Sequence, residues 1–168
     1  MEQQPAAPNP FDAIAPQHIA TLVAGAGVRK VRLPVLQTLA LGVLAGAFIA
    51  FGALFYLVVI TGSSFGFGPT RLLGGMAFSL GLILVVVAGA ELFTGNNLVV
   101  MAWAGGKVGM AELLRNWSLI YVANLIGAVA TAWVVWRSGV LGLAAGGVGE
   151  TLATVASGKL ALSWEAAF

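Results

Sequence analysis

The sequence predicts an all-α protein that crosses a lipid bilayer several times, and two observations carry this prediction. Sixty per cent of the 168 residues are hydrophobic and only 8% are charged, whereas a soluble domain carries about 25% charged residues. The hydrophobic residues also gather in long runs, each long enough to cross a hydrocarbon core of ~30 Å as a helix. This composition excludes a soluble enzyme and a nucleic-acid-binding protein, because too little polar surface is available to face water.

Residues 1–34 form the one long polar stretch of the chain. Prolines are frequent in residues 1–10, which predicts an irregular start. Apolar side chains recur at roughly helical spacing in residues 12–28. We therefore expect either a short amphipathic helix on the membrane surface or a tail without regular structure. A basic cluster directly precedes the first apolar run and consists of Arg29, Lys30 and Arg32.

Two uninterrupted apolar runs predict the first and third spans of a transmembrane region at residues 35–137. Residues 35–60 carry no charge and would form a helix of about 39 Å, which is long enough for a tilted crossing. Residues 117–136 form the other run, and a tryptophan stands at each of its ends. Tryptophan is enriched where the bilayer meets water, so its position here is typical of a membrane-spanning helix.

The run between these two, residues 72–104, is interrupted. It contains one charged residue, Glu91, and as a straight helix it would be about 50 Å long, which exceeds one perpendicular crossing. A carboxylate at membrane depth must be paired or face a cavity. One interpretation is two helical pieces joined by a break at residues 89–97 that lines a permeation pathway. The alternative is a span that ends at Ala90, followed by an interfacial cap and a helix lying flat.

The charges near the spans predict the orientation of the chain. Five basic residues lie on the side of the N-terminus and of the loop after the second run, whereas two lie on the other side. Cytoplasmic loops carry the excess of lysine and arginine, so we expect the N-terminus in the cytoplasm. Residues 138–168 are rich in glycine, alanine and valine and predict no further span. After three crossings they are expected to form an extracytoplasmic segment.

Few residues in the predicted spans can carry covalent or metal chemistry. The chain has no cysteine, and its single aspartate and single histidine, Asp12 and His18, both precede the first span. An intramembrane protease needs such groups within the membrane, and no glycine motif for phosphate or nucleotide binding is present. We therefore expect no enzyme activity, no metal site and no cofactor, and a solvated surface position for His18.

Apolar side chains near the break are candidates for the constrictions of a permeation pathway. Phe78 and Leu82 lie one turn apart on the second run, and Leu92 and Phe93 stand within the break. If the break folds back toward a pore, each pair would form an apolar constriction that excludes water. Packing against lipid or within the protein core is the alternative, and spacing alone favours it.

The segment GAELFTGN at residues 89–96, with FSLGLIL at 78–84, resembles the signature of the formate/nitrite transporter family. The resemblance implies an aquaporin-like fold of six spans in two inverted halves, of which this chain would supply the first three-span half-repeat. It also implies a homopentamer in the bilayer, with a pore in each protomer that passes small monovalent anions, often with a proton. Further similarity lies at residues 27–30, 114–117 and 121–127.

The resemblance also implies roles for individual residues. Phe78 and Leu82 would line the outer constriction, and Lys159 would raise the concentration of anions in an outer vestibule. The resemblance assigns the inner constriction and the loop at the break to Leu92, Phe93 and Thr94, and structural support of the break to Glu91, Gly95 and Asn96.

The family's fourth to sixth spans, with the histidine expected in the middle of the pore, have no counterpart in these residues. We therefore expect the chain to act as the N-terminal half of a small-anion pore in the inner (plasma) membrane. The alternative is a truncated subunit or remnant that does not transport.

Overall fold

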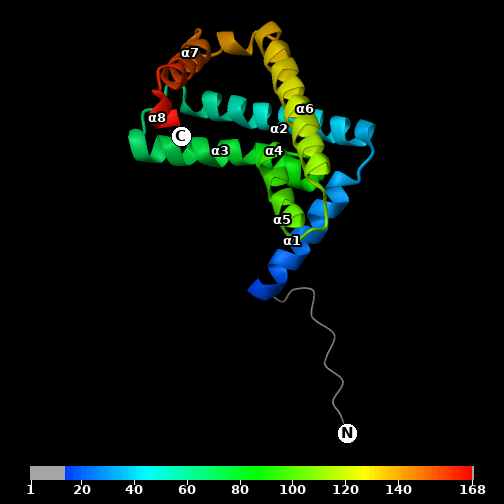
Figure 1. The fold of residues 1–168 in the computed structure, drawn as a ribbon. Helices are drawn as coiled ribbons and strands as arrows, with labels where there is room; N and C mark the ends of the chain where they lie inside the picture. The colour runs from blue at the N-terminus through cyan, green and yellow to red at the C-terminus, as the bar shows by residue number, and fades with distance from the viewer. Residues whose placement is uncertain (1–13, 168) are drawn as a thin grey trace.

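The computed structural model describes residues 14–167, in which all regular structure is helical (Figure 1). The predicted irregular start at residues 1–10 and the first two residues of the predicted surface helix lie outside this part. In chain order the helices are α1 (Pro16–Val31), α2 (Val35–Ile60), α3 (Phe67–Val87), α4 (Phe93–Asn96), η1 (Asn97–Val99), α5 (Val100–Ala104), α6 (Met110–Arg137), η2 (Val140–Gly142), α7 (Gly147–Leu160) and α8 (Trp164–Ala167).

Three of the described helices, α2, α3 and α6, are long and apolar enough to cross a membrane. The predicted all-α membrane fold with three spanning helices is therefore confirmed. α2 covers the same residues as the first predicted span. α6 begins at Met110, seven residues before the third predicted span, because a side chain in its first turn caps the helix start. There the Glu112 carboxylate accepts a hydrogen bond of 2.8 Å from the Gly109 N–H, as in a capping box.

α2 is the central helix, and it packs against both α3 and α6 (Figure 1). Glycines let the helix backbones approach closely. A Cβ atom on Gly46 of α2 would overlap the main-chain carbonyl of Asn124, and one on Gly127 of α6 would overlap the carbonyl of Val43. This close crossing fixes the position of the α6 side chains that reach the break.

The second predicted run is interrupted at the break with helical pieces on both sides of it, as the first of the two interpretations of the sequence predicts. α3 ends at Val87 in a Schellman motif, in which Gly89 takes φ +62° and the Ala90 N–H donates to the Val85 carbonyl at 2.9 Å. The chain is extended at Leu92 and then forms α4, η1 and α5. These short helices turn away from α3, and η1 and α5 pack against α1 (Figure 1).

The start of α3 differs from the predicted start of the second run. α3 begins at Phe67, five residues before residue 72. Pro69 falls in the first helical turn, where its missing N–H costs no hydrogen bond. Gly66 precedes the helix with φ +77°, a conformation that glycine adopts without strain.

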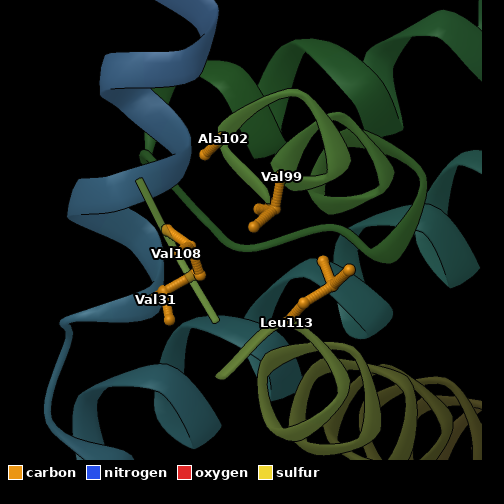
Figure 2. Packing of buried hydrophobic residues seen from close by; sticks show 5 residues of the cluster. All are labelled: Val31, Val99, Ala102, Val108 and Leu113. Carbon is orange, nitrogen blue, oxygen red and sulfur yellow. The ribbon is translucent and has the colours of Figure 1, made fainter. Parts of the chain in front are cut away.

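α1 is a regular helix, so the alternative of a tail without regular structure is wrong for residues 16–31. Ile19 and Leu22 are exposed on one face, together with His18. The other face packs against η1 and α5. Figure 2 shows the buried cluster next to this contact, which consists of Val31, Val99, Ala102, Val108 and Leu113.

The segment predicted to contain no span holds η2, α7 and α8. α7 has 14 residues and is therefore about 21 Å long, too short to cross the hydrocarbon core. The Thr61 hydroxyl, at the end of α2, donates a hydrogen bond of 3.0 Å to the Thr151 hydroxyl of α7. This contact holds α7, and with it Lys159, beside the end of α2 and the first half of α3.

Candidate functional site

The break is held by a buried polar network that begins at Glu91. Its side chain is only 7% exposed, and both carboxylate oxygens are engaged. Lys30 Nζ of α1 donates to Oε1 at 2.7 Å, and Asn96 Nδ2 donates to Oε2 at 2.8 Å. A carboxylate at membrane depth is tolerated when such partners replace water. The ion pair therefore explains how a charged residue can stand within an apolar run.

Asn96 is the centre of this network and is fully buried. Its Oδ1 atom accepts a hydrogen bond of 3.1 Å from Lys30 Nζ, and its Nδ2 group also donates to Asn116 Oδ1 at 3.1 Å. The Trp117 indole N–H donates to the main-chain carbonyl of Asn96 at 2.9 Å. The network thus joins α1, α4 and α6 at the break.

A second asparagine, Asn124 of α6, pairs main-chain groups at the break. Its Nδ2 group donates to the carbonyls of Gly42 and Glu91 at 2.8 and 2.9 Å, and its Oδ1 atom accepts from the Phe93 N–H at 2.9 Å. The Glu91 N–H donates to the Leu41 carbonyl of α2 at 3.2 Å. In lipid, each unpaired main-chain group costs several kcal/mol. These bonds therefore allow the irregular segment to lie beside the spanning helices.

A cleft of about 440 Å³ lies beside the network and is called here the break cleft. It contains three of the residues that the family resemblance assigned to constrictions, Leu82, Leu92 and Thr94. Lys30 also lines it. The side chain of Lys30 is 31% exposed, against 7% for the side chain of Glu91.

A second cleft, of about 740 Å³, lies between the first half of α3, the end of α2 and α7, and is called here the α7 cleft. Phe78 and Lys159 both line it, so the structure brings together the predicted outer constriction residue and the predicted vestibule lysine. Arg71 and Tyr56 line the same cleft. Arg71 is one of the two basic residues that the sequence places on the side of the spans opposite the N-terminus.

Phe93 takes a different position from the other predicted constriction residues. Its ring packs edge-on against Tyr121 and Trp117 of α6, with centroid distances of 5.4 and 6.5 Å. It does not line either cleft. Its role at a constriction stays a prediction.

Sequence reasoning missed the partners of Glu91 and of the freed main-chain groups. Lys30 was one of three neighbouring cations that all served the orientation argument. The signal in α6 was the presence of asparagines in an apolar helix, because such polar side chains face the protein interior in membrane helices. The missed partners are Lys30, Asn116, Trp117 and Asn124.

Comparisons with known proteins place these features in a family context. The family model described as formate/nitrite transporter matches residues 17–168. The chain is 42% identical over 134 residues to the formate channel FocA of Escherichia coli (strain K12) and 39% identical over 147 residues to the formate channel BtFdhC of Bacillus thuringiensis. These alignments cover 79% and 86% of this chain, but 47% and 56% of the relatives. The chain thus spans about half the length of the curated relatives it matches.

A solved structure is similar over the same part of the chain. It is described as a pentameric formate channel with formate bound, and it matches with a TM-score of 0.72 and 38% sequence identity. The match covers 77% of this chain and 51% of that chain. A TM-score and an identity of this size extend the similarity from the sequence to the arrangement of the helices.

Proposed function

The chain belongs to the formate/nitrite transporter family, and from this premise we propose that it forms one wall of a transmembrane pathway for small monovalent anions such as formate or nitrite. The wall is the face of α3 that α2 leaves uncovered, together with the break that follows it. The relatives named as formate channels support this class of substrate.

A single row of residues on α3 supports the proposal. The row follows the spacing of three or four residues that keeps side chains on one helix face, and its members line the α7 cleft and then the break cleft. From Arg71 to Val86 the row extends about 23 Å along the helix axis, most of the thickness of a hydrocarbon core. Its members are Arg71, Gly75, Phe78, Leu82 and Val86, and Gly89, just beyond the end of α3, continues the lining of the break cleft.

The observation that carries the proposal is the position of the polar network at the end of this row. Leu82 and Leu92 present apolar side chains to the break cleft, and apolar constrictions exclude water and strongly hydrated ions. Lys30 and Thr94 line the same cleft, and an ammonium and a hydroxyl both donate hydrogen bonds that suit an anion. A passing anion therefore exchanges hydration water for these donors in a confined space.

The same premise supports proposals about assembly and location. The protein is a homopentamer in the cytoplasmic (inner) membrane, and its N-terminus lies in the cytoplasm. The pentameric formate channel of similar structure supports the assembly, and the excess of basic residues on the N-terminal side of the spans supports the orientation. Protons accompany the anion in this proposal.

Uptake of radiolabelled formate by proteoliposomes that contain the full-length protein tests the pathway. We expect saturable uptake above that of protein-free liposomes. Leu82→Trp fills the break cleft and should lower uptake at least about tenfold. Ile83→Trp is the matched control, because Ile83 is exposed but does not line this cleft. Uptake equal to protein-free liposomes, or equal loss in both variants, would overturn the proposal.

A further inference from the structure

The α7 cleft carries two cations and no acidic side chain. Arg71 of α3 and Lys159 of α7 line it, and its remaining lining residues are uncharged. Within the described part of the chain, the one ion pair joins Lys30 and Glu91. The positive charge of Arg71 is therefore not neutralised by a carboxylate in contact with it.

Arg71 is held in place from two sides. Its guanidinium donates a hydrogen bond to the Tyr56 hydroxyl of α2, and its Cζ atom lies 5.3 Å from the centre of the Phe67 ring, within the range of a cation–π interaction. The Tyr56 ring in turn packs against Gly74, where a Cβ atom would come within 2.9 Å of it. A guanidinium has five N–H donors, so most of them stay available beside Tyr56.

Arg71 also stands at the head of the pathway row. Phe78 lies two helical turns further along the same face of α3, about 10 Å away along the helix axis. An anion that moves along the row from its head meets Arg71 before it meets the apolar ring of Phe78, and Lys159 lines the same cleft. A fixed charge at this point raises the local concentration of anions before the constriction.

We propose that Arg71 captures the transported anion at the mouth of the pathway, and that Tyr56 is its positioning residue. This inference depends on the proposed function and adds a binding residue to it. A planar guanidinium can present two parallel N–H groups to a carboxylate, so the site favours anions with two oxygens, such as formate and nitrite. Lys159 contributes a second positive charge to the same cleft.

The kinetics of formate uptake into right-side-out membrane vesicles test this role, with the full-length protein and its variants. Arg71→Gln should raise the KM for formate about three- to tenfold and leave kcat nearly unchanged. The difference should shrink at high ionic strength, because salt screens an exposed charge. Arg71→Lys should recover most of the KM at low salt. Arg137→Gln is the matched control, since Arg137 is also exposed beside an aromatic ring but does not line the α7 cleft.

Tyr56→Phe tests the positioning role without removing the charge. It should raise the KM for formate about twofold, and the same substitution combined with Arg71→Gln should add nothing further. An unchanged KM in Arg71→Gln, a loss confined to kcat, or an equal rise in Arg137→Gln would overturn the inference. If Arg71→Gln does not reach the membrane, an unchanged KM in Tyr56→Phe would overturn it as well. Absence of uptake by the unaltered protein would instead refute the proposed function.

Discussion

The polar network at the break and the α7 cleft place charged residues in opposite environments. At the break, Glu91 is buried and its two oxygens are bound by Lys30 and Asn96. In the α7 cleft, Arg71 and Lys159 are exposed and have no acidic partner among the lining residues. The comparison teaches that a charged side chain of this protein supports the fold where a partner neutralises it, and is available to a ligand where none does.

The largest effect is expected from Lys30→Met, which breaks the network. It leaves the buried Glu91 carboxylate without its cation and should lower the stability of the folded protein by about 3 kcal/mol, the lower end of the range for a buried pair because Lys30 is partly exposed. The midpoint of thermal unfolding in detergent measures this loss. The double variant Lys30→Met/Glu91→Gln should recover much of it, since a neutral amide needs no cation. A double variant no more stable than Lys30→Met would contradict the account.

Asn124→Leu should have the next largest effect. The substitution keeps the volume of the side chain but removes the donors and acceptor that pair Gly42, Glu91 and Phe93. Buried main-chain groups without partners cost about 1–3 kcal/mol each, and partial access of water should bring the total to about 2–3 kcal/mol. Leu125→Asn, at an exposed neighbouring position, makes the reverse exchange and controls for a change in the polarity of α6. Thermal stability equal to that of the unaltered protein would show that the break does not need Asn124.

The sequence alone predicted the spanning helices and the break, but not the side-chain contacts that join them. α2 matches its predicted bounds because 26 uncharged residues leave no other structure in a bilayer. Glu91 located the break because one carboxylate in an apolar run demands a special environment. Its ion pair with Lys30 was not predicted because the two residues are 61 positions apart. Arg29, Lys30 and Arg32 are alike in sequence, and only the packing of α1 against α5 turns Lys30 inward.

The candidate site was predicted in part for a similar reason. Local spacing placed Phe78 and Leu82 on one face of a helix, but it could not show that Lys159, on α7, returns to the cleft beside Phe78. It also could not separate Leu92, which lines the break cleft, from Phe93, which packs against Tyr121. Neighbours in an extended segment point in opposite directions, so their roles depend on what surrounds the segment.

Leu92→Ala tests whether the break cleft restricts passage, with a smaller effect on stability than the two variants above. Removal of the side chain widens the cleft, so uptake of a larger carboxylate such as lactate should rise several-fold relative to formate. Leu98→Ala is the control, because Leu98 is exposed on η1 and does not line the break cleft. Proteoliposome uptake of both anions gives the ratio. An unchanged ratio would remove Leu92 from the constriction.

The smallest effect is expected from Lys159→Gln in the α7 cleft. Lys159 is exposed and shares the cleft with Arg71, so its loss should raise the KM for formate only about two- to threefold at low salt. The folded protein should keep its thermal stability, because Lys159 is not part of the polar network at the break. A fall in thermal stability comparable to that of Lys30→Met would contradict the distinction between the two regions.

The central claim is that one face of α3 lines the pathway, and a pair of neighbouring valines tests it most directly. Val86 and Val87 are both strongly exposed, but only Val86 lines the break cleft. The 168 residues contain no cysteine, so Val86→Cys and Val87→Cys can each be labelled with a small water-soluble thiol reagent in the membrane. The account predicts that Val86→Cys is labelled and that formate slows its labelling. Val87→Cys should resist the reagent, because Val87 lies outside the face of α3 that lines the pathway. Equal labelling of both positions, or labelling of Val87→Cys alone, would contradict it.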